Sequence, residues 1–245
     1  MKVIAIITAR MRSTRLPGKS LLPLAGKPVL WWIAARILHC RYVDDIIIAT
    51  TNHKANIPIA DNHYLPFGSK VFQYKGEEDD VISRVLACAK WAKADIIVDI
   101  TGDCPLIDPR HIDYLINKLK KGDYDYTSNC SHRTWPDGLD IQVYKTKALE
   151  KVKNKFNPEH HTGWNIAQHP EVFKTYNRAA PMSMHWPELG LTLDTPEDYE
   201  LLKIIFDKFG NEAAFKIEDV IMFLRATPEL LKINKNVRRK IPEEG

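Results

Sequence analysis

The first nineteen residues constrain the fold more than any other stretch of the chain. Residues 3–7 (VIAII) form a continuous apolar run, which is typical of a strand that is buried on both faces of a parallel sheet. A loop with four cationic side chains, residues 8–19 (TARMRSTRLPGK), follows this run directly. Because ligands of open α/β sheets bind at the carboxyl ends of the strands, we expect this loop to line a ligand site.

The side chains of this loop suit a polyphosphate. Arginine offers a planar fork to phosphate oxygens, and lysine offers a compact point charge. Gly18 lets the backbone approach a ligand closely, and Pro17 stiffens the turn. The spacing matches neither a Walker loop nor the GxGxxG motif. A solvated basic loop is the alternative, because most arginine-rich loops are of that kind.

Composition restricts the class of protein. The formal net charge of the 245 residues is +4, which suits a small anionic ligand but is too small to argue for nucleic acid. The four cysteines are widely separated, which is typical of reduced cytosolic proteins rather than of disulfide frameworks or zinc sites. No apolar run reaches the roughly 18 residues of a membrane span, and no signal peptide precedes the first strand. We therefore predict a cytoplasmic protein without nucleic-acid or membrane partners.

Strands and helices alternate through the first half of the chain. Strands are predicted at residues 45–51, 70–74 and 95–101, and helices at 28–38, 58–65, 81–89 and 112–122. Such alternation predicts an α/β fold with a mostly parallel sheet covered on both faces. Later elements are predicted as strands at 141–144 and 191–194, a helix capped by Asn157, and helices at 196–209 and 217–231. We expect the basic residues 237–240 to form a solvated end.

Two aspartates follow predicted strands. Asp103 comes just after the strand at 95–101, and Gly102 beside it leaves room for a phosphate or a metal ion. Taken alone, Asp103 could equally be a turn residue or a helix cap. Asp194 precedes Thr195 and Asp198, which resemble a capping box. Helix capping explains those two residues but does not explain Asp194.

The string ARMRSTRLPGKSLLPLAGKPVL, residues 9–30, resembles the signature of the cytidylyltransferase family of CMP-sugar synthetases, and within it the spore-coat polysaccharide branch. The segments TGDCPLI (101–107) and LDTPED (193–198) resemble the two metal-binding elements of that family. The resemblance implies a Rossmann-like nucleotide-diphospho-sugar transferase fold as a single domain, residues 1–245. It also implies a nucleotide-binding half (about 1–122), an acceptor-facing half (about 123–245) and a homodimer.

The resemblance implies a reaction as well. An acceptor oxygen attacks the α-phosphorus of CTP, pyrophosphate leaves, and CMP is joined to an acidic sugar or a phosphonate-type acceptor for surface polysaccharide or glycan biosynthesis. Asp103 and Asp194 would share Mg²⁺, a hard cation that suits carboxylates and substrate phosphates. The catalytic residues would be Arg10, Arg15, Lys19 and Asp103, the nucleotide would also contact Ala9, Ser13, Thr14, Arg84 and Thr101, and the acceptor would contact Asp140.

Several of these segments also have a purely structural interpretation. The acidic segment 76–80 (GEEDD) suits a helix N terminus, and Pro-Asp-Gly at 136–138 is first a turn signal. His160 and His161 are adjacent, so they cannot form the i, i+4 pair of a zinc site. A nucleophilic role for Cys104 is disfavoured, because the implied chemistry needs no covalent step.

Two other functions are compatible with the sequence. One is a metal-dependent glycosyltransferase that consumes a nucleotide sugar, although the spacing of Asp99 and Asp103 does not match the usual Asp-x-Asp motif. The other is a non-catalytic nucleotide-binding protein of a polysaccharide locus, and the joint presence of Lys19, Asp103 and Asp194 argues against it.

Overall fold

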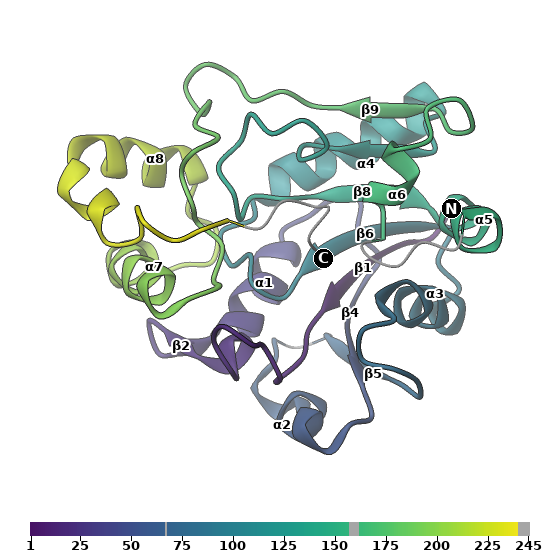
Figure 1. Ribbon diagram of the computed structural model, residues 1–245, viewed down its shortest axis with the longest axis horizontal. Coiled ribbons are helices and arrows are strands. Elements are labelled where there is room, and N and C mark those ends of the chain that lie inside the picture. The colour runs from purple at the N-terminus through teal and green to yellow at the C-terminus, as the bar shows by residue number, and fades with distance from the viewer. Residues whose placement is uncertain (67, 157–161, 240–245) are drawn as a thin grey trace.

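A twisted central sheet organises the protein (Figure 1). The computed structural model describes residues 1–66, 68–156 and 162–239, and within them the sheet has seven strands in the order β5-β4-β1-β6-β8-β7-β9. The strands are β1 Val3–Thr8, β4 Asp45–Thr51, β5 Lys70–Tyr74, β6 Ile96–Thr101, β7 Tyr126–Ser128, β8 Gln142–Lys145 and β9 Thr175–Asn177.

The sheet is mostly parallel, as the sequence predicts. The strands β5, β4, β1 and β6 run parallel to one another, whereas β8 is antiparallel to both β6 and β7, and β9 is parallel to β7. Side chains of β1 alternate between two apolar clusters: Val3, Ala5 and Ile7 belong to one, and Ile4 and Ile6 to the other. The apolar run at the amino terminus is continuous because both faces of this strand are covered.

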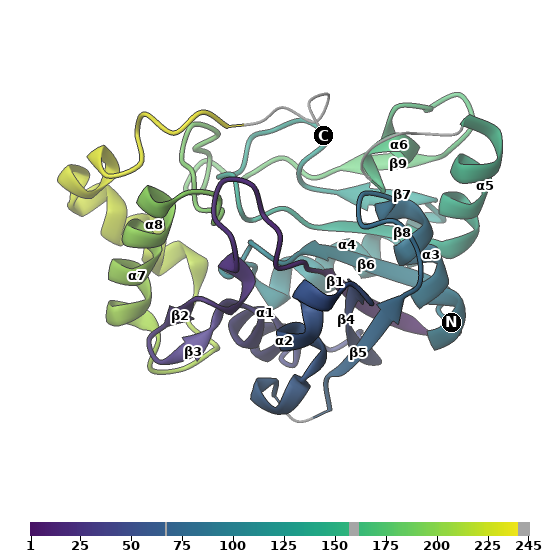
Figure 2. The ribbon, with the colours of Figure 1, turned by 60° about the horizontal axis from the view of Figure 1, so that its bottom comes forward.

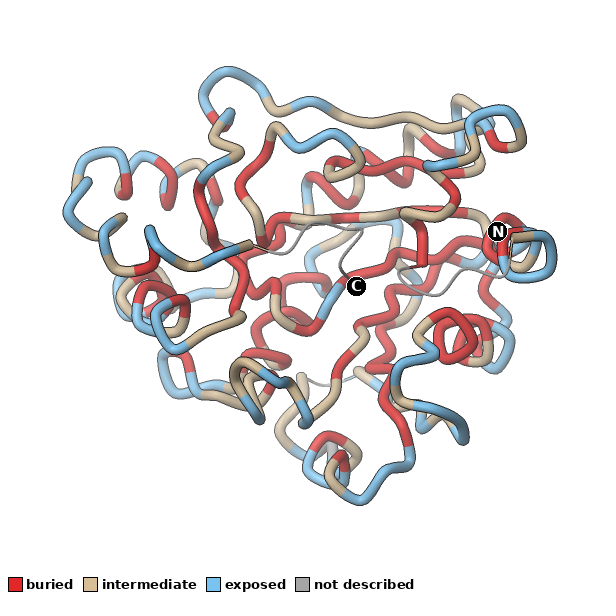
Figure 3. The backbone as a smooth tube through the Cα atoms, in the orientation of Figure 1, coloured by how far each residue is buried: buried red, intermediate tan, exposed pale blue. Residues whose placement is uncertain are grey.

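Helices cover both faces of the sheet (Figure 2). One apolar cluster includes residues of α1 Val29–Ile37, α4 Pro109–Gly122, α7 Pro196–Phe209 and α8 Ile217–Ala226. The other includes residues of α3 Val81–Ala92, α5 Thr146–Phe156 and α6 Trp164–Ala167. Buried segments run through the central strands and along the inner sides of the helices (Figure 3). The core therefore has two layers, one on each side of the sheet.

Short elements complete the described chain. They are the two-stranded β2 Pro23–Leu24 and β3 Lys27–Pro28, the helix α2 Ile57–Ala60, and the 3-10 helices η1 Lys19–Leu21, η2 Lys54–Asn56, η3 Asn62–Tyr64 and η4 Pro228–Lys232. The expectation of one helix over residues 58–65 is wrong. At Asp61 the backbone leaves the helical region, with ψ 78°, so α2 ends after one turn and a separate 3-10 turn follows.

The predicted strand at 191–194 is also wrong. Leu191, Thr192 and Leu193 are all buried, but the only pairing nearby in the described residues is the isolated bridge between Asp137 and Gly190. The segment makes single backbone bonds to two different loops, so no ladder forms. The predicted cap at Asn157 lies outside the described residues. Within the described part, no helix is long and apolar enough to cross a membrane.

Candidate functional site

A cavity of about 470 Å³ opens where the parallel strands β1 and β6 end. It collects ten of the eleven predicted site residues, and only Asp140 is outside its lining. The ten are Ala9, Arg10, Ser13, Thr14, Arg15, Lys19, Arg84, Thr101, Asp103 and Asp194. The topology explains this arrangement, because the parallel pairing of β1 with β6 brings the loops that follow them to one edge of the sheet.

Four charged side chains form the centre of the cavity. The Nζ atom of Lys19 lies 2.6 Å from Oδ2 of Asp103 and 2.8 Å from Oδ1 of Asp194. Arg15 Nη2 lies 2.8 Å from the other oxygen of Asp194. Burial opposes the charge on Lys19, but the two carboxylates outweigh it and raise the pKa of the amine. Burial also opposes the charge on Asp103, and Lys19 outweighs it, so the pKa of this carboxyl is lowered. Lys19 and Asp103 are therefore both charged at neutral pH.

The backbone explains why two distant aspartates meet here. The N–H of Gly102 donates to the carbonyl of Thr8 at 2.8 Å, which fixes the turn after β6 against the end of β1. A Cβ atom at Gly102 would lie 2.8 Å from that carbonyl oxygen, so the close approach requires glycine. The N–H of Leu193 in turn donates to the carbonyl of Asp103 at 2.9 Å. This bond places Asp194 beside Asp103.

Asp198 holds the segment that carries Asp194. The capping box is confirmed: Thr195 accepts from the N–H of Asp198, and the Asp198 carboxylate accepts from the N–H of Thr195. The same carboxylate oxygen accepts from the N–H of Asp194 at 3.1 Å. Helix capping therefore fixes the backbone of the predicted metal ligand as well as the start of α7.

The basic C-terminal segment does not behave as a solvated end. The Arg239 guanidinium donates to both oxygens of the fully buried Asp198 carboxylate, at 3.0 and 2.7 Å, and Asn234 donates to one of them at 2.8 Å. An ideal Cβ at Gly190 would lie 2.0 Å from Arg239, so only glycine leaves room for the guanidinium. The expectation for this segment is therefore wrong at Arg239, whose partner is too far away in sequence to be recognised. Lys240 lies outside the described residues.

The acidic segment 76–80 has both a structural and a site-facing part. Asp80 is the N-cap of α3 and accepts from the N–H of Ser83 at 3.0 Å, as the structural interpretation predicts. Asp79 forms an ion pair with Arg10 of the basic loop. The carbonyl of Glu78 accepts from Arg84 Nη1 at 2.8 Å. The segment thereby joins α3 to the wall of the cavity.

Arg84 lines the cavity but is almost fully buried, with 3% of its surface exposed. Its Nε–H has no hydrogen-bond partner in the described part of the chain. Burial lowers the pKa of this guanidinium, and the neighbouring Arg10 lowers it further. A buried cation with an unused donor suits an anionic or polar ligand group, because burial without a partner is costly.

The sequence analysis did not predict a group of polar residues that come from β6, β8 and the segment before α6. Asp99, Gln142 and Thr162 also line the cavity. Asp99 is 4% exposed and accepts hydrogen bonds from the hydroxyls of Tyr144 and Thr162. Burial raises the pKa of its carboxyl, although the two hydroxyls counteract this. The sequence feature that could have indicated this group is the carboxylate within the apolar run IIVDI, because an aspartate is rarely buried unless it has a partner.

Asp140 is the one predicted site residue that the structure places elsewhere. Its carboxylate accepts from both Nη atoms of Arg133, at 3.1 and 2.8 Å, and it does not line the cavity. The turn at 136–138 is confirmed, with φ 101° at Gly138. Burial and the neighbouring Asp140 raise the pKa of Asp137 to about 6. This loop is an ion-paired structural unit beside the site.

Cys104 lies next to Asp103 and is 3% exposed. Burial raises the pKa of its thiol well above the ordinary value, and the charge of Asp103 raises it further. A thiol in that environment stays protonated and is a poor nucleophile. His160 and His161 lie outside the described residues.

The donor set at the centre of the cavity fits magnesium. No group of three or more His, Cys, Asp or Glu side chains in the described ranges could hold a metal ion by itself. Asp103 and Asp194 supply two hard carboxylates side by side. Magnesium is commonly bound by one or two carboxylates together with substrate phosphates, so a pair is enough when a nucleotide is present.

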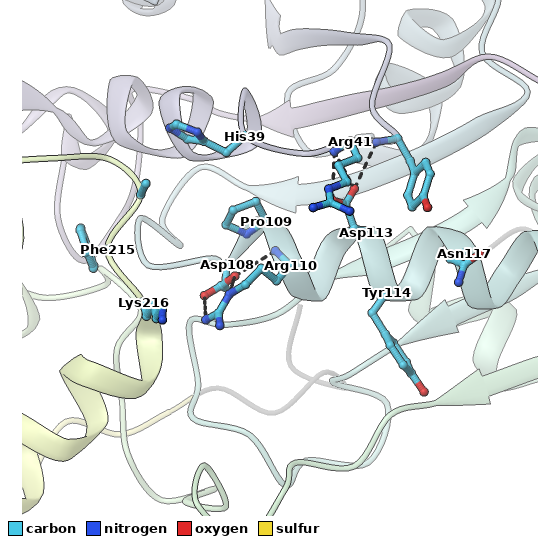
Figure 4. Close-up of a pocket in the computed structure, with 12 residues that line it drawn as sticks. His39, Arg41, Asp108, Pro109, Arg110, Asp113, Tyr114, Asn117, Phe215 and Lys216 are labelled. Atoms are coloured by element: carbon cyan, nitrogen blue, oxygen red, sulfur yellow. Dashed lines mark hydrogen bonds and ion pairs between the residues drawn. The ribbon is translucent and has the colours of Figure 1, made fainter.

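A second cavity, of about 490 Å³, lies between the start of α4 and the segment before α8 (Figure 4). Three of its charged side chains already have partners among the described residues. Arg110 pairs with Asp108 and Glu218, and Asp113 accepts from the backbone N–H groups of Arg41 and Tyr42. We assign no ligand to it.

Comparisons with known proteins identify the family of the chain. Residues 4–241 match the sequence profile of a family described as Cytidylyltransferase. The chain belongs to the cytidylyltransferase family. This cytidylyltransferase is 30% identical over 237 residues to the spore coat polysaccharide biosynthesis protein SpsF of Bacillus subtilis, covering 93% of this chain and 95% of that protein.

Solved structures show the same fold. A cytidylyltransferase from Leptospira borgpetersenii superposes with a TM-score of 0.84 at 30% identity, covering 98% of this chain and all of that one. A CMP:2-keto-3-deoxy-manno-octonic acid synthetase complexed with CTP gives a TM-score of 0.62 at 18% identity, covering 85% of this chain and all of that one. The second likeness concerns the fold only.

Proposed function

We propose that this cytidylyltransferase transfers CMP from CTP to an oxygen of a small acidic acceptor, a sugar acid or a phosphonate, and releases pyrophosphate. The observation that carries the proposal is the cluster of Arg15, Lys19, Asp103 and Asp194 at the edge of the parallel sheet. The similarity to SpsF supports a role in surface polysaccharide or glycan biosynthesis. The match of residues 4–241 to the cytidylyltransferase family supports the choice of nucleotide.

The basic loop would bind the triphosphate. Arg10, Arg15 and Lys19 reach the same cavity from one loop, and Ser13 and Thr14 add hydroxyl donors. As pyrophosphate leaves, negative charge grows on the bridging oxygen and on the leaving group. Fixed cations that surround this oxygen stabilise the transition state more than the ground state, which is the main contribution a protein makes to nucleotidyl transfer.

Asp103 and Asp194 would hold magnesium together with the phosphates of the nucleotide. When bound there, the ion supplies positive charge to the phosphate oxygens and makes a nearby acceptor hydroxyl more acidic. Lys19 now bridges the two carboxylates, and its flexible stem allows the ammonium to turn to the triphosphate when the nucleotide enters. The turn at Gly102 and the bond from Leu193 keep the two carboxylates together during this exchange.

Pyrophosphate release tests the proposal. The purified protein is incubated with each of the four ribonucleoside triphosphates, with and without magnesium, against a panel of sugar acids and phosphonates. We expect release with CTP and one acceptor, and its loss in EDTA. Asp103→Asn should lower kcat at least about 100-fold, because one interaction made in the transition state is worth about 2.7–4 kcal/mol. Asp113→Asn, an exchange at the second cavity, is the matched control.

Two results would contradict the proposal. If CTP does not bind, as measured by calorimetry with magnesium, the nucleotide assignment is wrong. If a nucleoside diphosphate appears instead of pyrophosphate, the protein is a glycosyltransferase. The proposed homodimer is tested separately by light scattering.

A further inference from the structure

Three polar residues form a distinct part of the cavity, which we call the β6–β8 subsite: Asp99, Gln142 and Thr162. Asp99 on β6 and Gln142 on β8 are direct partners in the antiparallel ladder, so their side chains stand next to each other on one face of the sheet. The triphosphate-binding loop follows β1, on the other side of β6. The subsite therefore faces a different part of the ligand from the one that the basic loop faces.

The subsite has unused hydrogen-bonding capacity. The hydroxyls of Tyr144 and Thr162 both donate to Oδ2 of Asp99, the first at 2.7 Å, and no described residue donates to Oδ1. Gln142 accepts at Oε1 from the hydroxyl of Tyr126 at 3.1 Å, and its amide nitrogen makes no hydrogen bond within the described part of the chain. One carboxyl oxygen and one amide N–H₂ group are thus left for a ligand.

The supporting residues hold these two groups rigidly. Tyr126 and Tyr144 are fully buried and stack at a centroid distance of 6.3 Å. Ser131 donates to the hydroxyl of Tyr126 at 3.2 Å, which leaves the proton of that hydroxyl for Gln142. A Cβ atom at Gly163 would lie 2.7 Å from Gln142 Oε1, so the loop with Thr162 closes over the pair only because residue 163 is glycine.

We propose that Asp99 and Gln142 bind neighbouring hydroxyl groups of the ligand, a vicinal diol. An acceptor oxygen beside an N–H donor complements hydroxyl groups, which both donate and accept. An ammonium group would leave the amide N–H unpaired, and a carboxylate or phosphonate would face the Asp99 carboxyl. The inference rests on the proposed function, and it narrows the acceptor to polyhydroxylated compounds if the diol belongs to the acceptor.

The burial of Asp99 is consistent with this ligand. Burial raises the pKa of the Asp99 carboxyl, and the hydroxyls of Thr162 and Tyr144 counteract this effect. A hydroxyl group complements the free oxygen Oδ1, since it can donate to a carboxylate. The diol has two possible sources, the acceptor and the ribose of CTP, and these are separated by experiment.

The test uses Asp99→Leu and Gln142→Leu, with Gln73→Leu on the exposed side of β5 as the matched control. Calorimetry with magnesium gives the Kd of CTP and of 2′-deoxy-CTP. Pyrophosphate release gives KM for two kinds of acceptor: 3-deoxy-manno-octulosonate and sialic acid, which carry vicinal hydroxyls, and 2-aminoethylphosphonate, which does not. Near-ultraviolet circular dichroism confirms that each variant is folded.

Two outcomes support the proposal. If the acceptor supplies the diol, both variants keep the wild-type Kd for CTP while KM for a hydroxylated acceptor rises at least tenfold. If the ribose supplies it, the Kd for CTP rises at least tenfold and that for 2′-deoxy-CTP, which lacks one of the two hydroxyls, rises less. In both cases Gln73→Leu matches the wild type.

Any other pattern overturns it. Such patterns are unchanged constants in both folded variants, equal weakening of CTP and 2′-deoxy-CTP, or an unchanged Kd for CTP in both variants together with efficient use of 2-aminoethylphosphonate and no use of the hydroxylated acceptors. The absence of turnover with every acceptor, together with unchanged CTP affinity in the variants, also counts against it. The proposed function fails separately, when the wild-type protein itself does not bind CTP.

Discussion

Arg239 should stabilise the protein although it lies near the end of the chain. Replacing it with alanine leaves the carboxylate of Asp198, which is 0% exposed, without its cationic partner. Breaking a buried pair in this way typically costs about 3–5 kcal/mol. Asp198 keeps the hydrogen bonds from Asn234 and from the N–H groups of Asp194 and Thr195, and the Arg239 side chain is 23% exposed. We therefore expect a smaller loss, of about 2 kcal/mol in the free energy of unfolding.

A double-mutant cycle in urea measures this contribution. Arg239→Ala is made in the wild type and in Asp198→Asn, and the free energy of unfolding is obtained from each transition. The arginine substitution should cost little in the second background, because the charge that it neutralises is gone. Lys235→Ala, which removes an exposed cation from the same segment, should change stability by no more than about 0.5 kcal/mol.

Arg239→Ala should also weaken the binding of CTP. Asp198 holds the N–H of Asp194, so a loosened Asp198 displaces one of the two carboxylates at the centre of the cavity. We expect a higher Kd for CTP with magnesium in Arg239→Ala. An equal cost in both backgrounds of the cycle, or a cost indistinguishable from that of Lys235→Ala, would refute the reasoning.

Four other substitutions test three separate features. Burial lowers the pKa of His111 to about 4, so the unfolded chain takes up the proton before the folded chain as the pH falls. The contribution of this histidine to the free energy of unfolding should be complete above about pH 6.5 and decrease by up to about 3 kcal/mol towards pH 4. His111→Gln should remove that part of the pH dependence, as measured by unfolding curves. Cys104→Ala should retain kcat within about threefold in the pyrophosphate assay, because a buried thiol with a raised pKa is not used in the reaction; loss of turnover in the folded variant would require a role for the thiol. Gly138→Ala should lower the free energy of unfolding by at least about 3 kcal/mol, since φ is 101° and a Cβ atom would lie 2.3 Å from the Thr192 amide nitrogen. Gly26→Ala, at φ 75° but with no atom within 4 Å of the new Cβ, should lower it only by the backbone strain of about 1 kcal/mol.

The parts of the fold that sequence predicts well are those set by local pattern. The buried strands β1, β4 and β6 appear as apolar runs, and the start of α7 appears as a capping box. The strand predicted at 191–194 is wrong because this buried segment makes one backbone bond to each of two loops rather than a ladder. Apolar residues in a sequence indicate which side chains are covered, and not what the backbone is bonded to.

The site was predictable where one segment carries several of its residues. The loop from Ala9 to Lys19 supplies six lining residues from a single string, and Asp103 and Asp194 were found because their motifs resemble known elements. The β6–β8 subsite was missed because its members come from three separate segments. Arg239 was missed because Asp198 already had a complete local explanation as a helix cap.

The bridge that Lys19 makes between Asp103 and Asp194 has a consequence for how ligands enter. Together with Arg15 these groups form a quartet with no net charge. Binding of a triphosphate to Lys19 and Arg15 would leave the two carboxylates without their partners, and Asp103 and Asp194, if they held a divalent ion, would leave the two cations free for phosphate. Each ligand thus prepares the site for the other. We expect nucleotide and magnesium to bind with positive heterotropic cooperativity, equal in magnitude whichever is added first.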